Sequence, residues 1–173
     1  MANSRGEIIK YLQSYKVNRN IKSIVIHCSA SKPDVLVSVD VIDKWHKARG
    51  FSKQKESGCY CGYHFVIPVD GSIEIGRRLN EVGAHVAGAN SNTIGIVYGG
   101  GLDAQGKAKD TRTASQTDGL IFLLQQLVCI FPKATICGHR DYSPDKNGNG
   151  IVEPWEWLKA CPCFDAKEEY KNI

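Results

Sequence analysis

Three residues of the types that bind zinc lie at or beyond the ends of strand-like segments. His27 lies near the end of the apolar run 21–28, His139 ends the short run 134–139, and Cys161 follows in a Lys-Ala-Cys-Pro sequence. Strand ends hold side chains rigidly, and zinc accepts two imidazoles and one thiolate, with a fourth position left for water in catalytic sites. No local signature joins the three residues, so ordinary polar histidines at strand ends are the alternative on spacing alone.

A second metal signal lies between His139 and Cys161. The segment 145–156 has the residue spacing of an EF-hand calcium loop, with Gly150 at the sharp turn. The predicted calcium ligands are Asp145, Asn147, Asn149, the Ile151 carbonyl and Glu156. Pro154 is unusual inside such a loop, and the alternative is an Asn-Gly turn leading into a short helix that begins at this proline. Calcium bound here would have a structural role and would brace the segment that carries Cys161.

Length, charge and cysteine content limit the class of protein. The chain has 173 residues, a formal net charge of +4 and seven cysteines. This length suits one domain with a well-buried core, and the small basic excess without a Lys/Arg run predicts no nucleic-acid partner. No apolar signal segment or membrane-length stretch is evident, so we expect a protein that is cytoplasmic as synthesised and has no membrane partner. An odd number of cysteines in such a chain favours thiols or metal ligands over a disulfide framework.

The elements that must position these residues can be read from apolar periodicity and from cap and turn residues. We expect an α/β fold: a single domain with a mixed central β-sheet flanked by helices. Asp70-Gly71 predicts a hairpin turn, Ser38 a helix N-cap, and Thr113 with Gln116 a capping box on a long helix that Pro132 ends. The predicted helices are 8–15, 38–50, 113–131 and a terminal helix after residue 165, and the predicted strands are 21–28, the two runs within 62–77, 92–98 and 134–139.

Six ordered motifs carry a family resemblance. They are IVIHCSAS, WHKARGF, GYHFVIPVDGSIEIGR, GAHVAGANSNTIGI, GHRD and KACPCFD, from about residue 21 to residue 165. In this order they resemble the zinc N-acetylmuramoyl-L-alanine amidases of the bacteriophage lysozyme type, whose fold peptidoglycan recognition proteins share. The resemblance implies a catalytic domain at 21–173, with the EF-hand-like loop as an insertion at 145–156, after an N-terminal helical extension at 1–20. It also implies that His27, His139 and Cys161 bind zinc at one end of the sheet.

The same resemblance assigns the chemistry. The catalytic tyrosine of the family falls on Tyr63 and its catalytic lysine on Lys159. Amide hydrolysis needs an activated water and a stabilised oxyanion, and a zinc ion lowers the pKa of its bound water to about 7. The Lys159 ammonium would bind the developing oxyanion, and the Tyr63 hydroxyl would orient the water or the tetrahedral intermediate. The implied reaction cleaves the bond between the lactyl group of N-acetylmuramic acid and L-alanine.

Further residues are candidates for the substrate groove. His85 matches a groove motif as a substrate contact or proton donor, and the alternative is a loop histidine that binds backbone. Asn90 holds either the same loop or the substrate, and His46 either lines the groove or packs its helix. His64 follows Tyr63 on a strand, faces the other way and is predicted to be a structural hydrogen bonder. The other cysteines near the site, which are Cys59, Cys61 and Cys163, are predicted to be plain thiols, and Cys161 is preferred as the ligand.

The sequence leaves several functions open. The main interpretation is a zinc amidase that acts as a phage or prophage endolysin or remodels the bacterial wall. It would be a monomer whose substrate is peptidoglycan or a muropeptide, released to the cell wall on lysis. A cytosolic muropeptide-recycling amidase is the near alternative, although relatives of that kind replace the cysteine ligand with a carboxylate. A non-catalytic peptidoglycan-binding protein and a calcium-regulated interaction protein are the alternatives from other classes.

Overall fold

A five-stranded mixed sheet forms the centre of the computed structural model, which describes residues 2–173. The strand order is β3-β2-β4-β1-β5, with β1 parallel to β4 and β5, β2 parallel to β4, and β3 antiparallel to β2. The strands are β1 (Ser23–Cys28), β2 (Phe65–Ile67), β3 (Glu74–Ile75), β4 (Thr93–Tyr98) and β5 (Thr135–Gly138). The helices are α1 (Arg5–Ser14), α2 (Val39–Ala48), α3 (Ala114–Ile130) and α4 (Ala166–Glu169), with 3-10 turns η1 (Asn90–Asn92), η2 (His139–Tyr142) and η3 (Pro154–Glu156). The predicted single mixed sheet with flanking helices is confirmed.

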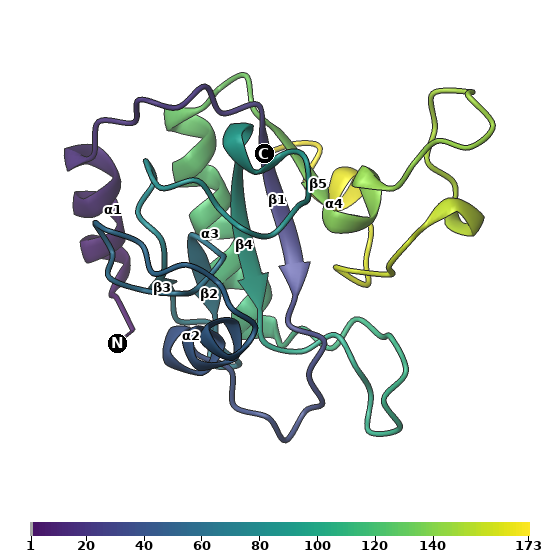
Figure 1. Cartoon of the computed structure of the whole chain (residues 1–173), viewed down its shortest axis with the longest axis horizontal. Helices are drawn as coiled ribbons and strands as arrows, with labels where there is room; N and C mark the ends of the chain where they lie inside the picture. The colour runs from purple at the N-terminus through teal and green to yellow at the C-terminus, as the bar shows by residue number, and fades with distance from the viewer. Residues whose placement is uncertain (1) are drawn as a thin grey trace.

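The sheet separates an apolar layer from the layer that carries the polar chemistry. Successive side chains of a strand point to opposite faces, and β1 follows this rule. Ile24 and Ile26 join the main core beneath α3, whereas Val25 packs on the opposite face. His27 shares the face of Val25, which is the face on which α2 lies in Figure 1. The main apolar core therefore lies between the sheet and α3, and the polar residues such as His27 lie on the opposite face.

Helix caps explain where two of the helices begin. The Ser38 hydroxyl accepts a hydrogen bond from the Val41 backbone N–H at 3.3 Å and starts α2 as predicted. Thr113 and Gln116 form the predicted capping box of α3, which ends before Pro132. Each such cap stabilises its helix by about 1 kcal/mol. The cap of α2 matters most for function, because this helix carries His46 toward the sheet.

The first helix begins earlier than the apolar pattern predicts. Its capping box pairs Ser4 with Glu7, so α1 starts at Arg5 and not at Ile8. Ile8 and Leu12 are buried in the same apolar cluster as the sheet. The predicted N-terminal extension therefore packs as part of one core.

The insertion 145–156 extends away from the sheet beyond β5, where Figure 1 draws it as a yellow-green loop. Its 3-10 turn η3 begins at Pro154, as the alternative to a calcium loop predicts. Within residues 2–173, no helix is both long enough and apolar enough to cross a membrane.

Candidate active site

The three predicted metal ligands converge although they lie far apart in the sequence. β1 and β5 are parallel neighbours, so His27 near the end of β1 and His139 just after β5 meet at the carboxyl ends of these two strands. Their Nδ1 atoms lie 3.1 Å apart, and the Cys161 sulfur lies 3.9 Å from His27 Nδ1. Among the described residues, this is the one group of three or more His, Cys, Asp or Glu side chains placed closely enough to hold a metal ion.

Two of the distances between these atoms are close to those expected around a tetrahedral ion. Zinc bonds of about 2.0 Å to nitrogen and about 2.3 Å to sulfur, at tetrahedral angles, separate two nitrogens by about 3.3 Å and a nitrogen from a sulfur by about 3.5 Å. The observed distances of 3.1 Å and 3.9 Å are each within a few tenths of an ångström of these values. Two imidazoles and one thiolate leave a fourth position free, which is the donor set of a catalytic zinc site and not of a closed structural one.

Backbone and side-chain hydrogen bonds fix the segment that brings in the cysteine. The Arg140 N–H donates to the Cys161 carbonyl at 2.8 Å, which ties this segment to the residue after His139. The Cys28 N–H points at the Cys161 sulfur from 3.3 Å, and such a donor stabilises a thiolate. The buried Tyr98 hydroxyl donates to the Pro162 carbonyl at 2.7 Å. The cysteine is therefore held from β1, β4 and η2 at once.

Burial keeps the two ligand histidines neutral. Desolvation, followed by the neighbouring His85, His139 and Lys159, lowers the pKa of His27 well below its ordinary value. Desolvation and then Lys159 also lower the pKa of the half-buried His139. A neutral imidazole has a free nitrogen lone pair, which metal coordination requires.

Tyr63 and Lys159 line the same groove as the three ligands. The groove has a volume of about 490 Å³ and is open to solvent. The ring of Tyr63 lies 5.1 Å from the ring of His27, centroid to centroid. Burial raises the pKa of Tyr63, so its hydroxyl keeps its proton and can donate a hydrogen bond at neutral pH. Lys159 also lines the groove and is exposed, so its ammonium group is accessible from solvent.

His85 and Asn90 also line the groove, but most of their polar atoms are engaged within the protein. The Asn90 side-chain oxygen accepts the backbone N–H groups of His85 and Val86 at 2.8 Å and 2.9 Å. His85 is 9% exposed and hydrogen-bonds through both ring nitrogens. Asn90 thus holds the loop, which is one of its two predicted roles, and the prediction that these residues bind substrate has no direct test in this geometry.

His46 and His64 are two buried histidines whose surroundings differ. His46 Nδ1 accepts the Gly62 N–H at 2.8 Å, and its ring lines the groove. Burial and the nearby Arg49 lower the pKa of His46 to about 4. His64 is fully buried and accepts the Gly95 N–H at 3.0 Å, so its prediction as a structural hydrogen bonder is confirmed.

The insertion 145–156 gives the calcium prediction no support. The Glu156 carboxylate is fully buried and accepts the backbone N–H groups of Lys146 and Glu153 at 2.6 Å and 2.8 Å. Asp145 likewise accepts the N–H of Gly150 at 2.7 Å. Within residues 2–173, the carboxylates of this loop do not form a cluster able to hold an ion. Calcium binding by the predicted set therefore stays a prediction: Asp145, Asn147, Asn149, Ile151 and Glu156.

The remaining cysteines separate into two groups. Cys59 and Cys61 pack in an apolar cluster beside α2, away from the ligand atoms. The Cys163 sulfur lies 3.8 Å from the Cys28 sulfur and contacts the Gly101 carbonyl. Cys161 is the cysteine that reaches the two histidines, as predicted.

Two residues of the site were not anticipated from the sequence. Thr93 and Tyr98 begin and end β4, and their hydroxyls hydrogen-bond to His85 and to Pro162. The parallel register places Tyr98 beside Cys28, directly after His27. That pairing is the signal that could have identified Tyr98, but it depends on strand order, which the sequence does not give.

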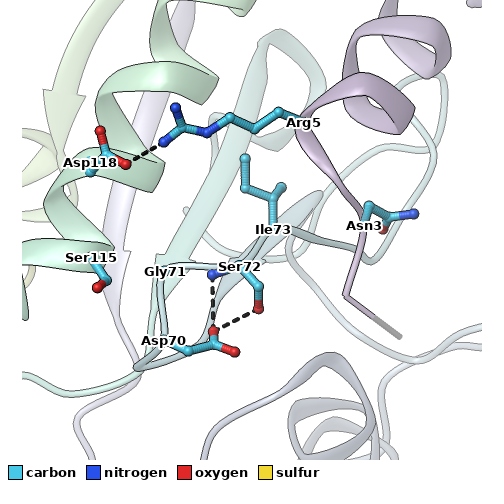
Figure 2. A pocket seen from close by; sticks show the side chains of 8 residues that line it. All are labelled: Asn3, Arg5, Asp70, Gly71, Ser72, Ile73, Ser115 and Asp118. Atoms are coloured by element: carbon cyan, nitrogen blue, oxygen red, sulfur yellow. Dashed lines mark hydrogen bonds and ion pairs between the residues drawn. The ribbon is translucent and has the colours of Figure 1, made fainter.

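A second hollow lies away from the groove, where the hairpin turn meets α1 and α3 (Figure 2). Arg5 reaches across it to form an ion pair with Asp118. Asp70 turns back to accept the N–H and hydroxyl of Ser72 at 2.9 Å and 2.7 Å. These groups build the turn and attach α1 to α3, so this hollow is structural.

Comparison with known proteins identifies the family. Residues 17–151 match the N-acetylmuramoyl-L-alanine amidase family (Amidase_2). The endolysin of Enterobacteria phage K11 is 37% identical over 147 residues, which cover 85% of this chain and 83% of the endolysin. The endolysin of Escherichia phage T7 is 35% identical over 158 residues, or 91% of each chain. An uncharacterized protein of Haemophilus influenzae is 54% identical over 97 residues, which cover 56% of this chain and 84% of that protein.

Solved structures agree with this assignment. The endolysin N-acetylmuramoyl-L-alanine amidase LysCS from Clostridium intestinale superimposes with a TM-score of 0.63 and 27% identity, covering 88% of this chain and 82% of that chain. PGRP-LB of Drosophila, at 22% identity, has the same fold with a TM-score of 0.63 over 91% of this chain and 84% of its own. The chain therefore belongs to the N-acetylmuramoyl-L-alanine amidase family and is an enzyme that acts on peptidoglycan.

Proposed function

We propose that His27, His139 and Cys161 hold one zinc ion, and that the chain uses this site to hydrolyse the amide between N-acetylmuramic acid and L-alanine. The observation that carries the proposal is the convergence of the three ligand atoms within 4.8 Å of one another, on the wall of an open groove. Zinc bound there would polarise the amide carbonyl and lower the pKa of its water to about 7.

Two side chains of the groove would serve the reaction itself. The Tyr63 hydroxyl is protonated at neutral pH. It would donate a hydrogen bond that orients the attacking water or an oxygen of the tetrahedral intermediate. The Lys159 ammonium lies on the segment that ends at Cys161 and binds the negative charge that develops on the carbonyl oxygen. Both groups act on charge that is larger in the transition state than in the substrate, so their loss lowers kcat more than it raises KM.

Substrate binding would use the groove that His46, Asn90 and Lys159 line. His46 lines the groove with a neutral imidazole, and its ring centroid lies 5.6 Å from that of Tyr63. Asn90 shapes the loop at the other side of the groove through its bonds to two backbone N–H groups. The groove is open, which suits a long polymer substrate better than a small molecule enclosed on all sides.

The biological setting that fits best is lysis or remodelling of the wall by a monomer synthesised in the cytoplasm. The endolysins among the relatives support this setting. The cysteine ligand also favours it over muropeptide recycling, because relatives of the recycling kind use a carboxylate at this position.

Digestion of purified sacculi tests the proposal. The zinc-loaded protein should release peptides with new L-alanine N-termini, detected by mass spectrometry, and metal analysis should find about one zinc per chain. Lys159→Ala and Tyr63→Phe should fold and hold zinc but lose activity. Full activity in either variant would contradict its assigned role, and intact sacculi cut no faster than soluble muropeptides would favour recycling.

A further inference from the structure

A chain of hydrogen bonds leads from the metal site into the interior. His27 Nε2 lies 2.9 Å from His85 Nδ1, and His85 Nε2 lies 3.3 Å from the Thr93 hydroxyl oxygen. The Thr93 hydroxyl in turn lies 3.1 Å from the Ala89 carbonyl oxygen. His27, His85 and Thr93 are each at most 9% exposed, so water does not compete for these contacts.

The Ala89 carbonyl at the interior end of this series determines which atom donates and which accepts in each of its hydrogen bonds. A carbonyl oxygen can only accept, so the single hydroxyl proton of Thr93 goes to Ala89. The Thr93 oxygen must then accept the proton of His85 Nε2. In a neutral imidazole only one nitrogen carries a proton, so His85 Nδ1 is left as an acceptor and receives the proton of His27 Nε2. His27 Nδ1 is thereby left bare, and it is the atom that faces His139 and Cys161.

The fold makes room for the ring of His85 by placing two glycines directly against it. A Cβ on Gly95 of β4 would lie 2.6 Å from the imidazole, and a Cβ on Gly83 would lie 2.5 Å from it. Both distances are shorter than real Cβ contacts allow. The ring of His85 is therefore closely packed. It lies edge-on to the ring of His27, with a centroid distance of 4.9 Å and an interplanar angle of 87°.

We propose that His85 and Thr93 are positioning residues for the metal ligand His27. Thr93 fixes the tautomer of His85, and His85 fixes both the tautomer and the ring orientation of His27, so that its Nδ1 lone pair is presented to the metal. This proposal rests on the proposed zinc site. It differs from the sequence-based expectation, in which His85 touches the substrate, because both nitrogens of His85 are already used inside the protein.

The inference predicts how the metal site responds to specific substitutions. Loss of a hydrogen-bond partner of a metal-ligating histidine typically weakens metal affinity 10–100-fold. His85→Leu removes the acceptor and should weaken zinc binding by about that factor. His85→Asn can place an amide oxygen near the position of Nδ1, so it should retain most of the affinity. If His85 only filled space, the apolar variant would be the milder of the two.

Thr93 allows a second, smaller change. Thr93→Val removes the hydroxyl while keeping the side-chain shape, and Thr93→Ser keeps the hydroxyl. The valine variant should weaken zinc binding and the serine variant should restore it. Thr117→Val on α3, where the hydroxyl bonds only to the Thr113 carbonyl of its own helix, is the matched control and should bind zinc like the wild type.

The decisive experiment measures tautomers in zinc-free protein. Long-range ¹H–¹⁵N NMR spectra of the chelator-treated wild type should place the proton of His27 on Nε2 and that of His85 on Nε2. A His27 proton on Nδ1 would overturn the proposal, as would equal zinc affinities for His85→Leu and His85→Asn by chelator competition. Absence of zinc binding in the wild type would instead overturn the proposed metal site. The tautomer spectra would still show whether Thr93 and His85 fix the tautomer of His27.

Discussion

The buried hydroxyl of Tyr98 offers a measurable link between the sheet and the segment that carries the proposed ligand Cys161. Tyr98 is fully buried at the end of β4, and its hydroxyl donates to the carbonyl of Pro162 at 2.7 Å. Pro162 follows the ligand Cys161 directly and is itself buried. Tyr98→Phe removes this donor without creating a sizeable cavity, so the main effect is a buried carbonyl that loses its hydrogen bond.

The size of the effect follows from that loss. Leaving one buried acceptor unsatisfied costs about 1–3 kcal/mol of folding free energy. For a chain of this length, 1 kcal/mol shifts the melting temperature by about 2–4 °C, so Tyr98→Phe should melt about 2–12 °C below the wild type. Part of the loss should appear in metal binding, because the freed carbonyl belongs to the segment that holds the cysteine.

Urea denaturation with and without zinc measures both parts. Zinc stabilises the folded state by an amount that depends on its dissociation constant, so the gain in unfolding free energy on adding zinc should be smaller in Tyr98→Phe than in the wild type. Tyr60→Phe is the control, because that ring is partly exposed beside Lys47 and should change stability by less than about 0.5 kcal/mol. The reasoning is refuted if the two variants unfold alike and gain equally from zinc.

Three further predictions concern pH, the insertion and the ligand cysteine. Burial and then Arg19 lower the pKa of His64 to about 3. Below about pH 6.5 His64 binds a proton in the unfolded chain but stays neutral in the folded chain. Its contribution to the free energy of unfolding is therefore complete above that pH and is lost as the pH falls. For His64 alone the loss at pH 4.5 is about 3 kcal/mol, and His64→Gln should flatten the pH dependence of urea midpoints in zinc-free protein; an unchanged slope would contradict this. Glu156→Gln replaces an acceptor oxygen that faces backbone N–H groups, so limited proteolysis should cut the insertion faster in this variant. The calcium prediction further requires that calcium slow this cleavage in the wild type and not in Glu156→Gln. Cys161→Ser should weaken zinc binding more than about 100-fold, beyond the loss expected for an outer partner, whereas Cys163→Ser should not; similar losses in both would contradict the ligand assignment.

Short-range patterns in the sequence predicted most of the fold. The apolar run 21–28 and the capped segment from Thr113 became β1 and α3, because their periodicity and caps lie within a few residues. The start of α1 was missed, since the apolar spacing begins at Ile8 while the Ser4–Glu7 capping box extends the helix backward. That signal was in the sequence and could have been used.

The interior of the site could not be predicted in the same way. The motifs pointed to His27, His139 and Cys161 as zinc ligands, and the structure brings their ligand atoms within 4.8 Å of one another. The partner of His27 depends on which residues meet across the sheet. Thr93 and His85 contact each other across β4, where the His85 ring occupies the space that Gly95 leaves open. Such contacts depend on strand order and on space left by glycines, and neither is a local pattern.

The segment 145–156 shows how a long connection between two of the proposed metal ligands can leave their positions unchanged. Its two ends are tied together at the base, where the Arg140 N–H meets the Cys161 carbonyl at 2.8 Å and the Leu158 N–H meets the Ser143 hydroxyl at 3.0 Å. The Arg140 guanidinium also lies 4.1 Å from the ring of Trp157. Because the entropy of loop closure grows only slowly with length, residues added beyond this clamp cost little stability. These contacts at the base fix the position of Cys161 relative to His139. Changes confined to the tip of the insertion should therefore leave zinc affinity unchanged, whereas substitution of Arg140 should lower it.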